Sequence, residues 1–203
     1  MTDEATETPS ERGAPPTLPR TTGTTTRLRT VPALEAAMFA LFRTTSLAAA
    51  ALTMGLTAGL FYGYACSVML ALGKVDDRTF VDVMQRINTA IINGWFALGF
   101  GGAAVFAVIS AALHWRGDGR SVLPWIVAAI VLYGVMFVIT GAVNVPLNND
   151  LAAAGDPASI TDLAGLRAHF EGTWVRWNIV RAVASTAAFG CLAWALVLEG
   201  RLR

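Results

Sequence analysis

The stretch Phe170–Arg181, Phe-Glu-Gly-Thr-Trp-Val-Arg-Trp-Asn-Ile-Val-Arg, decides the fold, because it leads into an uncharged run that ends only at Glu199. Residues three, four and seven positions apart share one helical face, and this face carries Trp174, Trp177, Asn178 and Arg181. A cation inside an apolar helix is costly unless it meets a partner or water. The stretch therefore predicts a polar site at one end of a membrane bundle.

Long uncharged runs divide the rest of the chain into spanning segments. The 203 residues are 14% charged, against about 25% in a soluble domain. No Asp, Glu, Lys or Arg lies between Arg43 and Lys74, Arg86 and Arg116, Arg120 and Asp150, or Arg181 and Glu199. A helix needs about 20 apolar residues to cross a bilayer. We predict an all-α, four-helix transmembrane bundle with spans near 45–72, 88–114, 122–145 and 174–198. The alternative, a soluble helical bundle, would show polar helix faces.

The segments outside these spans predict a tail and two connectors. Residues 1–31 are rich in Thr, Pro, Glu and Arg and lack the apolar residues of a core, which predicts a disordered tail before a membrane domain, 32–203. The charged segment 73–86 predicts an interfacial helix that runs into the second span. Pro146 is expected to end the third span, and 151–169 to form a small outer connector with a helix start at Ser159 or Thr161.

Basic residues near the spans predict the orientation. They gather in the tail, in segment 115–121 and at the carboxyl end, which the positive-inside rule assigns to the cytoplasm. The sequence thus predicts a multi-pass protein of the cell membrane, with both termini cytoplasmic. The net charge of +1 does not indicate the basic surface that a nucleic-acid-binding protein needs, so no nucleic-acid partner is expected.

A ladder of small residues runs along the first span. Gly55, Gly59 and Gly63 repeat every four residues, a spacing that lets a neighbouring helix approach closely. Packing within the bundle is the preferred interpretation, and homo-oligomerisation through these glycines is the alternative.

Hydrogen-bonding side chains gather at the outer ends of the four predicted spans, whereas the inner ends are almost featureless apart from Ser110 and His114. The outer set consists of Tyr62, Tyr64, Cys66, Asn88, Asn93, Thr140, Asn144, Asn148, Trp174, Trp177, Asn178 and Arg181. Polar groups inside a membrane need partners, so we predict a shared pocket for a small lipophilic molecule. Two alternatives stay open: the asparagines join helices, and Arg181 extends to the headgroups.

The sequence predicts no cofactor or metal site. His114 and His169 lack the paired spacing of zinc or di-iron sites. Asp150, His169 and Glu171 could meet at the outer rim, so a metal there is left open. Cys66 and Cys191 fall near opposite membrane faces, so no disulfide is expected between them.

Two motifs suggest a family. Asn144-Val-Pro146-Leu-Asn148, followed by Trp174-x-x-Trp177-Asn178-x-x-Arg181, resembles the anthrone-oxygenase-like integral membrane family over about 45–198. One departure is Leu70, where a proline is expected. Named members oxidise polyketide anthrones with molecular oxygen and no evident metal or flavin.

The resemblance implies a site without a redox cofactor. Arg181, Asn178 and Asn144 would stabilise the oxygen of an anthrone enolate, and Glu171 or His169 would accept the proton. Two other functions compete: a non-enzymatic protein that binds a small ligand or lipid headgroup, and an accessory subunit of a membrane complex. The oxygenase and the ligand-binding protein both need a cavity lined by the predicted side chains. An accessory subunit would instead bury these side chains against each other.

Overall fold

The computed structural model describes residues 1–2 and 23–202, and in these residues the fold is all-α. The chain divides into two units, residues 1–38 and 39–203, and the site lies in the second. Most of the predicted tail, residues 3–22, lies outside the described residues, and a helix begins at Gly23.

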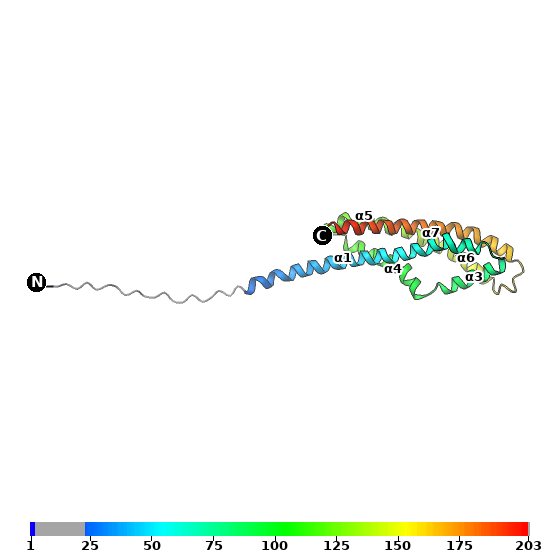
Figure 1. The fold of residues 1–203 in the computed structure, drawn as a ribbon, viewed down its shortest axis with the longest axis horizontal. Coiled ribbons are helices and arrows are strands. Elements are labelled where there is room, and N and C mark those ends of the chain that lie inside the picture. The colour runs from blue at the N-terminus through cyan, green and yellow to red at the C-terminus, as the bar shows by residue number, and fades with distance from the viewer. Residues whose placement is uncertain (3–22, 203) are drawn as a thin grey trace. The chain divides into compact units, whose positions relative to one another are not determined.

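The helices follow one another with short connections (Figure 1). They are α1 (Gly23–Gly63), η1 (Tyr64–Val68), α2 (Met69–Leu72), α3 (Asp77–Ala90), α4 (Gly94–Leu113), η2 (Gly117–Ser121), α5 (Leu123–Ile139), η3 (Thr140–Asn144), α6 (Val145–Ala153) and α7 (Leu163–Gly200). Four stretches are long and apolar enough to cross a membrane: Ala33–Leu72, Gly94–Leu113, Leu123–Ala153 and Leu163–Gly200. The predicted four-helix membrane architecture is therefore confirmed.

The helix α7 is longer than a membrane crossing requires. Its 38 residues extend about 57 Å at 1.5 Å per residue, against a hydrocarbon core of about 30 Å. The first turns of α7 pack with α2, α3 and α6 into a separate apolar cluster, which we call the cap (Figure 1). The cap core contains Met69, Leu72, Phe80, Val81, Met84, Leu147, Leu151, Phe170 and Trp174.

Polar contacts hold the cap together. The Asp76 side chain stabilises the N-terminus of α3 by accepting a hydrogen bond from the Thr79 amide at 3.0 Å. On α7, the Arg167 guanidinium donates to the Val75 carbonyl at 2.8 Å and to an Asp77 carboxylate oxygen at 3.0 Å. Arg167 thus ties α7 to the connector after α2.

Pro146 does not end the third helix, contrary to the prediction. A proline lacks the amide hydrogen of a helix interior and crowds the preceding turn. Here the five-residue π-helical turn η3 precedes it, and Pro146 occupies the first turn of α6, where the missing amide hydrogen costs least. As a result Asn148 lies on a helix rather than in a loop.

The predicted second and fourth spans also need new boundaries. The interfacial helix does not run into the second span, because α3 ends at Ala90 and Asn93 caps a new helix, α4. The fourth helix begins at Leu163, capped by Asp162, and continues to Gly200, so the predicted start in the connector belongs to α7 itself.

The end of the bundle opposite the cap is not featureless, because a buried charge cluster lies there. The Glu199 carboxylate is 1% exposed and accepts hydrogen bonds from Arg43 Nε at 2.9 Å and Thr44 Oγ1 at 3.1 Å. His114 Nε2 lies 3.4 Å from its other oxygen. The cluster joins α1, α7 and the end of α4, which are far apart in sequence.

The glycine ladder packs against another helix at one position. A methyl group at Gly55 would lie 3.1 Å from the Phe189 ring on α7, whereas one at Gly59 or Gly63 would meet no atom within 4 Å. Gly55 therefore supports the predicted packing within the bundle, and homo-oligomerisation stays a prediction.

Gly55→Leu should destabilise the protein, because the side chain must displace Phe189. Overpacking of this kind costs about 1–3 kcal/mol. Thermal unfolding in detergent measures the change, and Gly59→Leu on the same helix is the control. Equal unfolding temperatures for the two variants would contradict the packing at Gly55. A change of particle mass in Gly59→Leu alone would support contact between copies.

Candidate functional site

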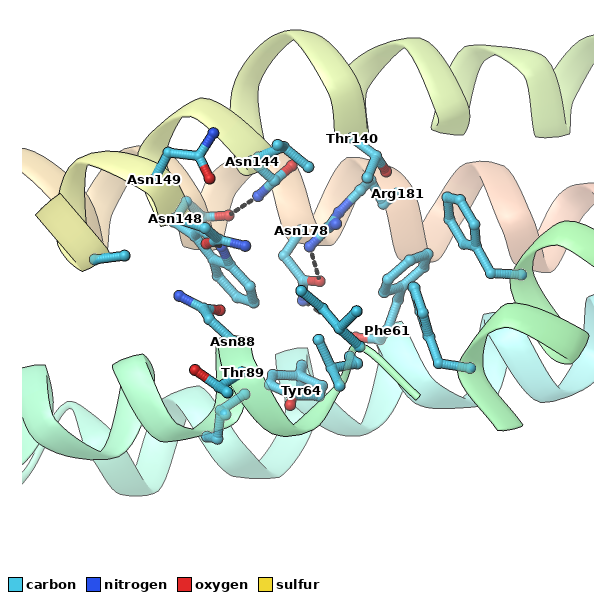
Figure 2. A pocket seen from close by; sticks show the side chains of 18 of the residues that line it. Phe61, Tyr64, Asn88, Thr89, Thr140, Asn144, Asn148, Asn149, Asn178 and Arg181 are labelled. Carbon is cyan, nitrogen blue, oxygen red and sulfur yellow. Dashed lines mark hydrogen bonds between the residues drawn. The ribbon is translucent and has the colours of Figure 1, made fainter. Parts of the chain in front are cut away.

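A cavity of about 420 Å³ lies where the cap meets the bundle. This volume falls within the range of about 300–1,000 Å³ that small-molecule sites occupy. Every long element except α5 contributes to the lining: α1 and α4 supply phenylalanines, whereas α3, α6 and α7 supply carboxamides (Figure 2). The lining residues are Phe61, Tyr64, Gln85, Ile87, Asn88, Thr89, Ile91, Ile92, Phe96, Phe100, Thr140, Asn144, Val145, Asn148, Asn149, Ala152, Trp174, Asn178 and Arg181.

Arg181 brings a positive charge to this cavity. The residue is 5% exposed, and its guanidinium carbon lies 4.4 Å from the centre of the Phe61 ring and 5.3 Å from that of Trp174. In the described part of the chain it forms no ion pair, and its Nε has no hydrogen-bond partner. The ring faces compensate only part of the cost of burying a cation. The guanidinium is therefore free to bind a negative group in the cavity.

Asn178 holds this guanidinium in place. Its side-chain Nδ2 donates to the Phe61 carbonyl at 3.1 Å, and its Oδ1 accepts from Arg181 Nη2 at 2.9 Å (Figure 2). The carboxamide oxygen, rather than its nitrogen, thus points to the charged group. Asn178 positions Arg181 between α1 and α7.

A second set of carboxamides surrounds Trp174. Asn144 donates through Nδ2 to the Trp174 carbonyl at 3.3 Å, and Trp174 Nε1 donates to Asn148 Oδ1 at 2.8 Å. Asn144 Oδ1 and Asn88 Nδ2 are buried without a partner in the described residues. An unpaired buried acceptor and donor are costly, which favours a ligand whose polar groups pair with them.

Both π-helical turns of the chain's described part contribute to this cavity. Tyr64 begins η1, and Thr140 and Asn144 bound η3. π-Helical turns within α-helices occur frequently at functional sites, because they change which side chains face inward. No residue pattern in the sequence marks the first of these turns. Tyr64 lies three residues after Phe61 and shares its helical face, whereas Tyr62 is 63% exposed and lies outside the cavity lining.

Eight members of the predicted outer set line the cavity together: Tyr64, Asn88, Thr140, Asn144, Asn148, Trp174, Asn178 and Arg181. Sequence reasoning missed Phe61, Phe96 and Phe100, whose rings form the apolar wall between α1 and α4. Aromatic residues are common in every membrane helix, so their type alone gave no signal.

Four predicted substrate-binding residues lie outside the cavity lining. Tyr62 is 63% exposed and Cys66, a free thiol, is exposed, since each lies well round the helix from Phe61 or Tyr64. The Asn93 side chain caps the start of α4, where its Oδ1 accepts a hydrogen bond from the Phe96 amide at 3.0 Å. Trp177 is half-buried, on the far side of Trp174 from Asn178 at about 100° per residue.

The two predicted proton acceptors also lie elsewhere. Glu171 accepts a hydrogen bond from Arg167 at 2.7 Å, within the cap. His169 is exposed, with its ring 4.0 Å from Asp150. Since Glu171 pairs with Arg167, the three residues considered for a metal do not form one cluster; no group of three metal-ligating side chains occurs in residues 1–2 and 23–202.

The cavity contains unpaired polar atoms. An accessory subunit is expected to pair its polar side chains with each other, so this cavity does not favour that function.

The comparison with known families agrees with the resemblance seen in the sequence: residues 93–191 match the family model described as Anthrone oxygenase. This segment contains Asn144, Asn178 and Arg181, and it leaves out α1 and α3. No curated protein and no solved structure matches the chain.

Proposed function

We propose that this chain, which belongs to the anthrone oxygenase family through residues 93–191, oxidises a lipophilic, anthrone-type aromatic ketone with molecular oxygen. The observation that carries the proposal is the Arg181 guanidinium, buried beside an aromatic cavity with no anionic partner in the described residues. Such a group suits a substrate that becomes an oxyanion during the reaction.

The chemistry starts at the methylene group of the substrate. An anthrone loses a proton from this carbon, and the electron pair delocalises onto the carbonyl oxygen to give an extended enolate. Arg181 stabilises this oxygen more strongly than the neutral carbonyl, because the negative charge develops in the transition state. The charge interaction is stronger here than in water, since Arg181 is 5% exposed and its guanidinium lies against the Phe61 and Trp174 rings.

The enolate then reacts with oxygen directly. One electron passes to O₂, and the resulting radical and superoxide combine into a carbon–oxygen bond, which after protonation is a hydroperoxide. Loss of water from this group gives the second carbonyl of the quinone. One anthrone and one O₂ thus yield one quinone and one water, so the electrons balance without a further reductant.

The other cavity residues orient the substrate. Phe96 and Phe100, whose rings stack, provide an apolar wall for the fused rings, and Phe61 meets Phe100 edge-on. The unpaired Asn144 Oδ1 would accept a hydrogen bond from a phenolic hydroxyl, and the unpaired Asn88 Nδ2 would donate one to a second oxygen. Asn178 acts through Arg181, so it is a positioning residue.

One feature favours the alternative, a protein that binds such a molecule without converting it. In the described residues no carboxylate or imidazole lines the cavity, so no strong base faces the ligand. Binding and turnover differ in the consumption of oxygen, which the following experiment measures.

Protein purified in detergent should consume oxygen with a panel of anthrones, with one O₂ taken up per quinone formed. An oxygen electrode and absorbance follow the reaction, and ¹⁸O₂ should place one labelled oxygen in each quinone. Protein-free buffer with the same detergent gives the spontaneous rate. A rate equal to this background, with the anthrone bound, would reject the oxygenase and leave the binder.

A further inference from the structure

Tyr64 lines the cavity, but the proposed chemistry gives it no role so far. In the described part of the lining, Tyr64 and Arg181 are the only residues with titratable side chains. The Tyr64 hydroxyl has no hydrogen-bond partner there, although the residue is half-buried. The step that still lacks a residue is the acceptance of the substrate proton.

Tyr64 and Arg181 approach the cavity from opposite walls. Tyr64 lies at the start of η1, directly after α1, whereas Arg181 lies on α7 (Figure 2). The Tyr64 ring packs against that of Trp174, with centroids 5.9 Å apart, so its position is fixed by a residue of the same site.

The shape of an anthrone matches this arrangement. Its carbonyl and its acidic methylene group occupy opposite edges of the central ring. A substrate whose carbonyl oxygen contacts Arg181 therefore presents the methylene group to the opposite wall. A proton acceptor must come within hydrogen-bond reach of that edge, and tyrosine is among the side chains that act in this way.

We infer that Tyr64 is a catalytic proton relay, an assignment that rests on the proposed function. The methylene carbon–hydrogen bond breaks, and its electron pair moves to the carbonyl oxygen beside Arg181. The proton binds the Tyr64 oxygen, which releases its own hydroxyl proton to water. The phenol is restored, and one proton leaves for each enolate formed.

Proton transfer can be measured apart from oxidation. Without oxygen, in deuterium oxide, the wild-type protein should accelerate exchange of the anthrone methylene hydrogens, followed by mass. Tyr64→Phe should lower this acceleration by about 10²-fold, the usual contribution of a positioned proton-transfer group. Binding of the anthrone, followed by fluorescence, should change less than about threefold, because the ring remains. Tyr62→Phe, at an exposed residue outside the cavity, is the control and should match the wild type.

The outcomes separate this inference from the proposed function. Unchanged exchange in Tyr64→Phe, or no wild-type acceleration of exchange, overturns the relay, while oxygen uptake decides the oxygenase separately. Exchange that depends on Tyr64 without any oxygen uptake supports the relay and rejects the oxygenase. Loss of anthrone binding in step with loss of exchange overturns the relay in favour of a role in holding the substrate.

Discussion

Arg181→Leu is expected to lower kcat for anthrone oxidation by about 10²–10³-fold, the usual cost of removing one donor to a developing oxyanion. KM should change less, because the aromatic wall that binds the neutral rings is retained. The variant should fold, since an apolar side chain replaces a buried charge without an ionic partner in the described residues. Asn178 loses one hydrogen bond, worth about 1 kcal/mol.

A matched control lies on the same helix. Arg176 is exposed and outside the cavity lining, so Arg176→Leu removes the same charge and should leave kcat unchanged. Oxygen uptake and quinone absorbance give both rates. Arg181→Lys should fall between the wild type and Arg181→Leu, because it keeps a charge and loses the planar fork. Equal kcat in Arg181→Leu and the wild type would refute the oxyanion role.

Glu199→Ala is expected to destabilise the bundle by about 3–5 kcal/mol, the usual cost of removing one partner from a buried ion pair. The substitution leaves the buried Arg43 guanidinium without its carboxylate, and it leaves His114 beside an empty space. Unfolding in detergent, followed by circular dichroism, measures the change. The physical reason is desolvation, since the Arg43 side chain left behind is only 11% exposed and is largely shielded from water.

Two further variants test this explanation. Asp82→Ala removes the carboxylate from an exposed pair with Arg86, so it should cost less than about 1 kcal/mol. Arg43→Met with Glu199→Met removes both charges and should recover most of the lost stability. If the double variant were as unstable as Glu199→Ala, lost packing would explain the effect, and the charge argument would fail.

Two site features followed from spacing alone. One cavity contains side chains from both predicted features. Asn178 and Arg181 come from the polar face of Phe170–Arg181, and Asn144 comes from the motif near the end of the third span. Helical period and uncharged runs are local properties, so they can be read without knowing which helices touch. The two predicted proton acceptors lie outside the cavity lining, and Glu171 is paired with Arg167, which also binds Asp77 across the cap.

The sequence by itself determined that four apolar helices form this protein and that the asparagines and Arg181 share one end, because length, charge and period are carried by the residues themselves. The tertiary structure decided the rest. It brought Phe96 and Phe100 into the cavity lining, carried a helix past Pro146, and paired Arg43 with Glu199 across 156 positions of the chain. Each depends on helical turns or on contacts between distant helices, whose energy appears only when the helices pack.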